Sequence, residues 1–227
     1  MELSIRLNKI ASMVEKCVRM ADIGTDHAYI PIYLVENEVC ESAIASDINN
    51  GPVEKAKQNV SHHKLDGKID LRLGGGFSTI RPKEVECAVI AGMGGNLIRD
   101  IIEEGIDVFK ELDYCIVQPV QNPEILREHI YKRGYKIIDE ELCLEDNKFY
   151  EIMKIRFDTD YEEVDPIYFE ISRKLIEKRH PLLNEYIKSK IEKYYNILKY
   201  ITEETELATA KKAQVNEKIS RLKELLL

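Results

Sequence analysis

The sequence predicts a doubly wound α/β sheet followed by an all-helical C-terminal part. Up to residue 160, short runs rich in Val and Ile alternate with stretches of helical spacing. No strand-like run follows that residue, and the charge balance changes at the same place. Strands that alternate with helices are typical of a parallel sheet covered on both faces. We therefore predict one domain over residues 1–160 and a second, helical domain over residues 161–227.

Five apolar runs have the length and composition of buried parallel strands. They cover residues 17–23, 42–47, 69–73, 86–91 and 114–118. Pro52 and Glu54 mark a helix start after the second run, because proline suits a first turn and glutamate favours the positive end of the helix dipole. Two further runs, 135–143 and 149–156, follow Gly134 without room for a helix between them. These two runs predict an antiparallel pair that closes one edge of the sheet.

Residues 161–227 have helical spacing almost throughout. Apolar side chains recur every three or four residues along two stretches, which places each set on one stripe of a helix. The first set is Leu183, Ile187, Ile191, Tyr194, Leu198 and Ile201, and the second is Val215, Ile219, Leu222 and Leu226. The polar residues 202–206 predict a turn, so the two helices form an antiparallel hairpin. One long kinked helix is the alternative, which would leave its stripe exposed in a monomer.

The composition limits the class of protein. With 227 residues, of which 44% are hydrophobic and 33% charged, the chain can bury a sizeable core. No apolar run approaches the roughly 20 residues that span a bilayer, and no signal segment follows the first residues. We expect a cytoplasmic protein without a membrane partner, present as a monomer or weak dimer. The cysteines form no CxxC pair, so we expect core side chains and neither disulfides nor a metal site. They are Cys17, Cys40, Cys87, Cys115 and Cys143.

The net charge of −8 argues at first against a nucleic-acid partner, because cations must meet the phosphates. The deficit lies in residues 1–160, with 20 basic and 29 acidic side chains, whereas residues 161–227 carry 13 basic and 12 acidic ones. One predicted helix over residues 173–199 has a net charge of +5. We expect this helix to bind a phosphate backbone, and a solvated helix face is the alternative. The candidate RNA-binding residues are Arg173, Lys174, Lys178, Arg179, Lys188, Lys190 and Lys193.

The most informative segment is the predicted turn Asp22-Ile23-Gly24-Thr25-Asp26 at the end of the first strand. In open α/β sheets, ligands bind beyond the carboxyl ends of the strands. Gly24 lets a ligand approach the backbone closely. Asp47 ends the next strand, 23 residues after Gly24, and can accept hydrogen bonds from ribose hydroxyls. Together these residues predict a ligand that contains adenosine.

The same turn lacks the later glycines of a dinucleotide motif, with Asp26 and Tyr29 in their places. A carboxylate repels phosphate but suits a cation, and S-adenosylmethionine carries an ammonium and a sulfonium group. We therefore predict an S-adenosylmethionine site, with an NAD-dependent dehydrogenase as the alternative. Asp22 and Asp26 also fit a turn residue and a helix cap. His27 fits a structural role as well as a functional one.

Two glycine clusters, residues 74–76 and 92–95, follow the third and fourth strands at the same edge. Clustered glycines are costly in chain entropy, which indicates a closely packed ligand or an unusual turn. A flexible surface turn is the alternative for the first cluster. Gln118 ends the fifth strand and supplies an amide that can pair with a nucleobase edge.

Six segments occur in one order: residues 3–7, 22–29, 46–48, 91–95, 118–119 and 148–152. With patterns such as Asp-Ile-Gly-x-Asp-His-Ala-Tyr and Ala-Gly-Met-Gly-Gly, the combination resembles the bacterial tRNA (adenine-22-N1)-methyltransferase family. The resemblance implies a Rossmann-like class I methyltransferase domain that uses S-adenosyl-L-methionine, followed by a coiled-coil-like helical domain that helps to bind tRNA. It implies methylation of N1 of the adenine at tRNA position 22.

Carried onto this sequence, the resemblance gives a set of site residues. The candidate cofactor-binding residues are Asp22, Gly24, Asp26, His27, Asp47, Ile48, Gly75, Gly76, Ala91, Gly92, Met93 and Gly94. The catalytic candidates, as positioning groups, are Asp26, Met93 and Gln118. Tyr29 either stacks on the target base or fills the core. Family members often carry an acidic residue where this chain has Gly75, so another group must contact the adenine of the cofactor.

The implied reaction sets few demands on proton transfer. Adenine N1 already has a lone pair, so no general base is obligatory, and the base must be exposed before it can react. Two other functions remain open from the sequence. One is a small-molecule methyltransferase, and the other is a non-catalytic RNA-binding protein with a vestigial cofactor fold.

Overall fold

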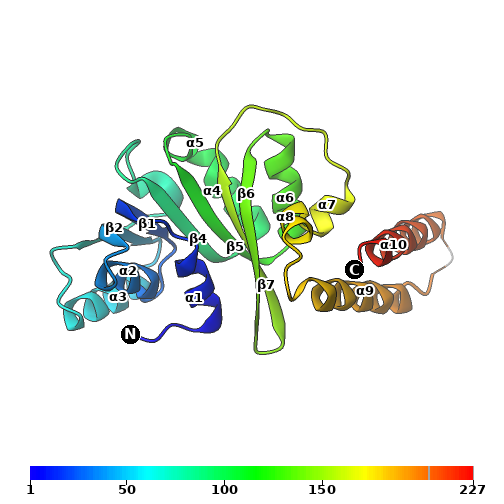
Figure 1. Cartoon of the computed structure of the whole chain (residues 1–227), viewed down its shortest axis with the longest axis horizontal. Coiled ribbons are helices and arrows are strands. Elements are labelled where there is room, and N and C mark those ends of the chain that lie inside the picture. The colour runs from blue at the N-terminus through cyan, green and yellow to red at the C-terminus, as the bar shows by residue number, and fades with distance from the viewer. Residues whose placement is uncertain (204, 227) are drawn as a thin grey trace. The chain divides into compact units, whose positions relative to one another are not determined.

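The structure is a computed structural model that describes residues 1–203 and 205–226. It contains two compact units, Met1–Val164 and Asp165–Leu227. The sequence placed this division between residues 160 and 161. The first unit is a seven-stranded sheet with helices on both faces, which confirms the predicted α/β class (Figure 1).

The sheet has the strand order β3-β2-β1-β4-β5-β7-β6. Its strands are β1 (Cys17–Ile23), β2 (Cys40–Asp47), β3 (Ile69–Leu73), β4 (Cys87–Gly94), β5 (Tyr114–Gln121), β6 (Lys136–Glu145) and β7 (Lys148–Arg156). The first five are parallel, and β7 pairs antiparallel with both β5 and β6. The predicted antiparallel pair at one edge of the sheet is therefore confirmed.

Three strands extend beyond their predicted ends: β4 to Gly94, β5 to Gln121 and β6 to Glu145. Sequence reasoning ended the fifth strand at Gln118, but β5 continues through Pro119 to Gln121. Its antiparallel pairing with β7 covers only residues 115–117. Pro119 lies beyond that stretch, where a strand tolerates the loss of one N–H donor.

The helices of the first unit form two layers, one on each face of the sheet. The first layer is α1 (Ile5–Ser12), α2 (Tyr29–Glu36) and α3 (Asn50–His62); the second is η1 (Gly76–Thr79), α4 (Gly95–Glu104), α5 (Ile106–Phe109) and α6 (Pro123–Lys132). Strand side chains alternate between the layers: Met20 packs in the first core, and Ala21 in the second. Apolar strand side chains fill both cores, so the polar residues of the parallel strands lie mainly at the strand ends.

The second unit is helical, with α7 (Ile167–Glu170), α8 (Arg173–Glu177), α9 (Leu183–Tyr200) and α10 (Glu206–Glu224). The chain turns back between α9 and α10, and the two helices pack against each other, which confirms the helical hairpin (Figure 1). Of the predicted turn at 202–206, Glu204 lies outside the described residues. The buried side chains are largely those of the predicted stripes: Leu183, Tyr186, Ile187, Ile191, Val215, Ile219 and Leu222.

The prediction of one basic helix over residues 173–199 is wrong. The chain leaves helical geometry after α8, where Arg179 has a φ of +49°. Pro181 follows and has no N–H group to donate to an earlier carbonyl. The seven candidate RNA-binding residues are thus divided among α8, the turn and α9.

Within residues 1–203 and 205–226, no helix is both long and apolar enough to cross a membrane.

Candidate active site

The candidate site lies at the carboxyl edge of the parallel strands. The chain runs outward from β1 to β2 and β3 on one side and to β4 and β5 on the other. The crevice at such a reversal of strand order is the usual ligand site of an open α/β sheet. The ends of five strands bring together the segments that the sequence singled out: 22–26, 47–48, 74–76, 91–94 and Gln118.

Two glycines shape the backbone between β1 and β4. Gly24 has a φ of +80°, and a Cβ atom added there would overlap the Cε atom of Met93. Gly92 has a φ of +78°, and the pairing of β4 with β5 shifts register between Ala91 and Met93. A non-glycine residue would be strained at either position. The glycines after β4 therefore form a defined bulge that brings Met93 against the turn after β1.

Asp22 is a buried carboxyl group at the centre of this edge. Only 7% of the residue is exposed. Burial raises the pKa of Asp22 to about 6; a hydrogen bond with Thr25 opposes this shift, and the nearby charge of Asp47 adds to it. An ionised carboxylate here lacks solvent and faces a like charge, so a bound cation would stabilise it.

Asp47 and its neighbours form the β2 side of the crevice. The Asn49 backbone N–H donates to Asp47 Oδ1 at 2.7 Å, and the Gly74 backbone N–H donates to the Asp47 carbonyl oxygen at 2.9 Å. Ile48 is exposed, and a Cβ atom added at Gly75 would lie 3.3 Å from its Cδ1 atom. A carboxylate beside an exposed apolar side chain suits a ribose next to an adenine ring.

Asp26, His27 and Tyr29 lie at the rim. The Asp26 side chain is 70% exposed, and its Oδ2 atom lies 3.3 Å from His27 Nε2. The rings of His27 and Tyr29 stack with centroids 4.9 Å apart and planes 8° apart. Tyr29 is 39% exposed, which answers the question left open by the sequence: its ring does not fill the core.

Gln118 is buried and has both ends of its amide engaged. Its Oε1 atom accepts from Arg6 Nη1 at 2.7 Å, and its Nε2 atom donates to the Pro119 carbonyl oxygen at 2.9 Å. Arg6 also lies over the Tyr150 ring, 5.4 Å from its centroid, and its backbone N–H donates to Glu145 Oε1 at 3.0 Å.

Arg6 is the site residue that sequence reasoning missed. It stands in segment 3–7, which carries part of the family resemblance but received no role. It belongs to α1, outside the strand-end pattern that identified the other residues. Two features of the sequence could have identified Arg6. It is a charged residue in a segment that carries the family resemblance, and the α/β pattern gives no reason for a charge at this position.

Among the RNA-binding candidates, Lys190 has a structural partner. Its Nζ atom donates to the Glu170 carbonyl oxygen at 2.7 Å and lies 3.4 Å from the Glu170 carboxylate. Although burial opposes ionisation, Lys190 and Lys218 lower the pKa of Glu170 to about 2.

The other RNA-binding candidates lie in different surroundings. Arg173 lies 5.6 Å from the Tyr168 ring centroid, and Lys174 Nζ is 3.6 Å from Glu177. Four further cations of this set are exposed: Lys178, Arg179, Lys188 and Lys193.

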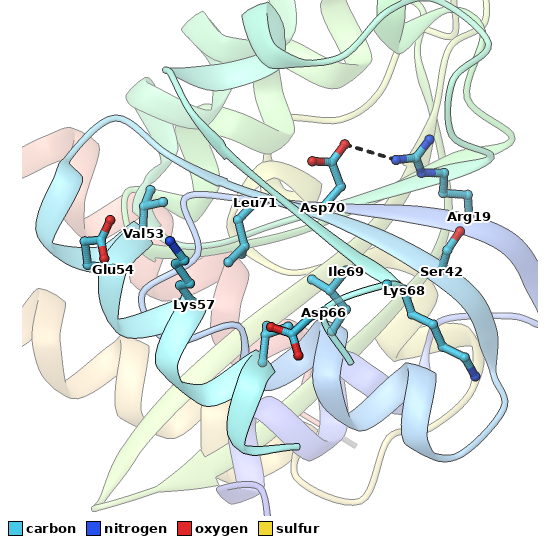
Figure 2. A pocket seen from close by; sticks show the side chains of 12 residues that line it. Arg19, Ser42, Val53, Glu54, Lys57, Asp66, Lys68, Ile69, Asp70 and Leu71 are labelled. Atoms are coloured by element: carbon cyan, nitrogen blue, oxygen red, sulfur yellow. Dashed lines mark hydrogen bonds and ion pairs between the residues drawn. The ribbon is translucent and has the colours of Figure 1, made fainter. Parts of the chain in front are cut away.

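An open hollow of about 700 Å³ lies elsewhere, along the edge strand β3 and helix α3 (Figure 2). Arg19 Nη2 lies 3.3 Å from Asp70 Oδ2 within it. None of the candidate residues line this hollow. In the described part of the chain, no three His, Cys, Asp or Glu side chains are arranged to hold a metal ion.

Comparison with known proteins relates the chain to one family. Residues 20–224 match the model of the family described as tRNA (adenine(22)-N(1))-methyltransferase. The Bacillus subtilis (strain 168) protein of that name is 40% identical over 153 residues, which cover 67% of this chain and 64% of that protein. The match thus spans slightly less than two thirds of the length of this relative.

Two solved structures extend the similarity along the whole chain. The crystal structure of the B. subtilis tRNA methyltransferase TrmK has a TM-score of 0.89 at 31% identity, and the match covers 100% of this chain and 99% of that one. A Streptococcus pneumoniae protein in complex with S-adenosyl-L-methionine has a TM-score of 0.88 at 31% identity, with 100% of both chains covered.

Proposed function

The chain belongs to the tRNA (adenine(22)-N(1))-methyltransferase family, and we propose that it transfers a methyl group from S-adenosyl-L-methionine to N1 of the adenine at tRNA position 22. The observation that carries the proposal is the pair Asp22 and Asp47 at the ends of β1 and β2. Two carboxylates at a strand-order reversal suit a ligand that joins a cationic end to a ribose.

The residues present fit the cofactor. Burial disfavours the ionised form of Asp22, and the ammonium group at the methionine end of the cofactor would stabilise that form. Gly92 leaves room for a close approach, because a Cβ atom added there would meet only Arg6 Nη1 at 3.9 Å, and Asp47 can accept from the ribose hydroxyls. Ile48 offers an apolar face for the adenine ring. When bound, the cofactor supplies a methyl group on an electron-poor sulfonium.

The chain's own contribution to transfer is positioning. Methyl transfer to a nitrogen lone pair is an in-line displacement, which depends on holding donor and acceptor in contact. We assign this positioning to Met93, beside the β1 turn, and to Gln118, which is buried and acts through the Arg6 guanidinium that it holds. The target adenine must leave its stack to present N1. The stacked pair of His27 and Tyr29 at the rim provides an aromatic surface for that base.

We assign tRNA docking to the second unit. The exposed cations Lys178, Arg179, Lys188 and Lys193 can meet phosphates. Lys190 is left out of this set because Glu170 neutralises its charge. Salt-sensitive tRNA binding is the expected signature of such contacts.

Labelled S-adenosyl-L-methionine and tRNA transcripts with adenine or guanine at position 22 test the function directly. We expect 1-methyladenosine at position 22 of the first transcript and no label in the second. A small-molecule methyltransferase would label neither tRNA, and a non-catalytic binding protein would retain tRNA without transfer. Equal labelling of both transcripts would contradict the assigned position.

We expect the Arg6→Ala variant to lose roughly 100-fold in kcat, because misplacing a positioning group by about 1 Å costs this much. The Kd for S-adenosyl-L-methionine should stay unchanged, since the Arg6 side chain contacts Gln118, Glu145 and Tyr150. Single-turnover kinetics and calorimetry measure the two quantities. Arg99→Ala, which removes a partly exposed arginine paired with Asp100, is the matched control and should keep full activity. An Arg6→Ala variant with wild-type kcat would remove Arg6 from the site.

We expect the Gly75→Asp variant to bind the cofactor several-fold more tightly. Gly75 has an extended backbone, with φ of −95°, so a side chain is compatible with its conformation. The nearest obstacle is the Ile48 Cδ1 atom at 3.3 Å, which needs to shift by only a few tenths of an ångström and can still face the adenine ring. The new carboxylate can accept from the adenine amino group, whereas Gly75→Ala adds only a Cβ atom. Calorimetry should show tighter binding for the first variant alone; equal Kd values for both would contradict the prediction.

A further inference from the structure

Three cysteines lie together at the edge of the sheet opposite to the candidate active site. Cys17, Cys40 and Cys87 are the first residues of β1, β2 and β4. Cys17 Sγ lies 3.2 Å from Cys40 Sγ and 3.9 Å from Cys87 Sγ. Cys40 and Cys87 are buried, as expected of core side chains, and Cys17 is partly exposed. The three lie together because parallel strands bring their starting residues to one edge.

We propose that Cys17 and Cys40 are a redox modification site, at which a peroxide converts the two thiols into a reversible disulfide. The two residues are direct register partners in the parallel pair β1–β2. Neighbouring strands lie about 4.8 Å apart, and disulfides span Cα separations of roughly 4.4–6.8 Å. The backbone already has the required spacing, so the sulfur atoms need to approach by only about 1 Å to reach bonding distance.

Register also decides between the two neighbours of Cys17. Cys87 is the partner of Met20, three residues further along β1. Its Cα atom is therefore displaced along the strand from that of Cys17, and the two sulfur atoms lie 3.9 Å apart, against 3.2 Å for Cys17 and Cys40. Cysteines that are not direct register partners need a larger backbone shift to reach disulfide geometry. Cys40 is therefore the preferred partner of Cys17.

Cys17 is the thiol that meets the oxidant. It is partly exposed, whereas Cys40 and Cys87 are buried. It lines an open hollow of about 550 Å³ together with Lys16, Glu86 and Tyr114. Hydrogen bonds from the other two thiols lower the pKa of Cys17, which favours the reactive thiolate. Cys40 is held as the protonated partner, because its hydrogen bond with Cys17 and its burial raise its pKa.

The chemistry balances with hydrogen peroxide as the oxidant. The Cys17 thiolate attacks one peroxide oxygen, the O–O bond breaks, and hydroxide leaves, which gives a sulfenic acid at Cys17. Cys40 then gives up its proton, and its sulfur attacks Cys17 and displaces a second hydroxide. Two thiols and one peroxide thus yield one disulfide and two water molecules. A reducing dithiol reverses the modification.

The test treats the reduced full-length protein with one equivalent of hydrogen peroxide, blocks the remaining thiols by alkylation, and analyses it by mass spectrometry. We expect one disulfide and three alkylated cysteines per chain, a single peptide pair joined through Cys17 and Cys40, and full reversal by dithiothreitol. The Cys115→Ser variant, which removes a buried cysteine on the other face of the sheet, should behave as wild type. The mass-spectrometric readout does not depend on methyl transfer. The redox proposal and the proposed function can therefore fail independently.

A Cys40→Ser variant should stop at the sulfenic acid, with the mass of one oxygen added at Cys17. A Cys87→Ser variant should still form the disulfide, and its circular dichroism spectrum serves as the check on folding. A disulfide between Cys17 and Cys87, or wild-type protein that keeps both Cys17 and Cys40 reduced while other residues oxidise, would overturn the proposal.

Discussion

Replacing Asp22 by asparagine is expected to stabilise the free protein and to weaken cofactor binding by at least about 100-fold. Burial raises the pKa of Asp22 from 3.8 to about 6. At pH 7 the ionised carboxylate therefore costs the folded state on the order of 3 kcal/mol relative to the unfolded chain. Asparagine has nearly the same shape and can still hydrogen-bond with Thr25, but it carries no charge. The same change removes the anion that a cationic ligand needs.

The raised pKa of Asp22 also predicts how the free energy of unfolding changes with pH. Between about pH 4 and pH 6 the folded protein holds a proton on Asp22 that the unfolded chain has released. The free energy of unfolding of the wild type therefore falls as pH rises through this window, and the Asp22→Asn variant lacks that loss. Urea denaturation should show the largest gain for the variant at pH 7 and none near pH 4.

Asp26→Asn is the matched control, because the Asp26 side chain is 70% exposed. Because this carboxylate is solvated in both states, the variant should leave the free energy of unfolding at pH 7 nearly unchanged. Calorimetry of the wild type should show cofactor binding that tightens from pH 5 to pH 7, since a bound cation favours the ionised Asp22. Equal unfolding free energies for wild type and Asp22→Asn at pH 7 would show that the carboxyl group is not strained by its burial.

The ends of β1, β2 and β3 were predictable because their signals are local, whereas β4 and β5 run three residues beyond their predicted ends. Runs of Val and Ile set the five parallel strands, and a polar or glycine residue after each run marks its carboxyl end. Parallel strands in one sheet end at one edge, so the sequence alone was enough to place Asp22, Gly24 and Asp47 together. The helical stripes of α9 and α10 were predictable because the apolar period is also a local signal.

Contacts that depend on register or on side-chain direction were not predictable. Arg6 and Gln118 are separated by 112 residues, and nothing in either local pattern says that one donates to the other. Cys17 and Cys40 are neighbours only because of the register of β1 and β2, which no local pattern fixes. The break between α8 and α9 is different, because Pro181 was a visible signal that the chain leaves the helix before it.

The largest loss of stability is expected from replacing Arg127, the buried cation that ties α6 to the edge of the sheet. Its Nη2 atom lies 2.7 Å from Glu140 Oε1 on β6 and 2.5 Å from Glu151 Oε2 on β7. The side chains of Arg127, Glu140 and Glu151 are 0%, 1% and 3% exposed. Arg127→Met keeps the volume but leaves two buried carboxylates without the guanidinium, which costs about 3–5 kcal/mol.

Urea denaturation at pH 7 measures this loss, and two comparisons show its origin. Arg133→Met, at the end of the same helix, removes a guanidinium whose side chain is 49% exposed and paired with Glu103, so it should cost less than about 1 kcal/mol. Adding Glu140→Gln and Glu151→Gln to Arg127→Met removes the buried charges and should recover part of the stability. If the triple variant is less stable than Arg127→Met alone, the loss comes from packing around the Arg127 side chain. The arginine would then hold β6 and β7 through its hydrocarbon stem and not through its charge.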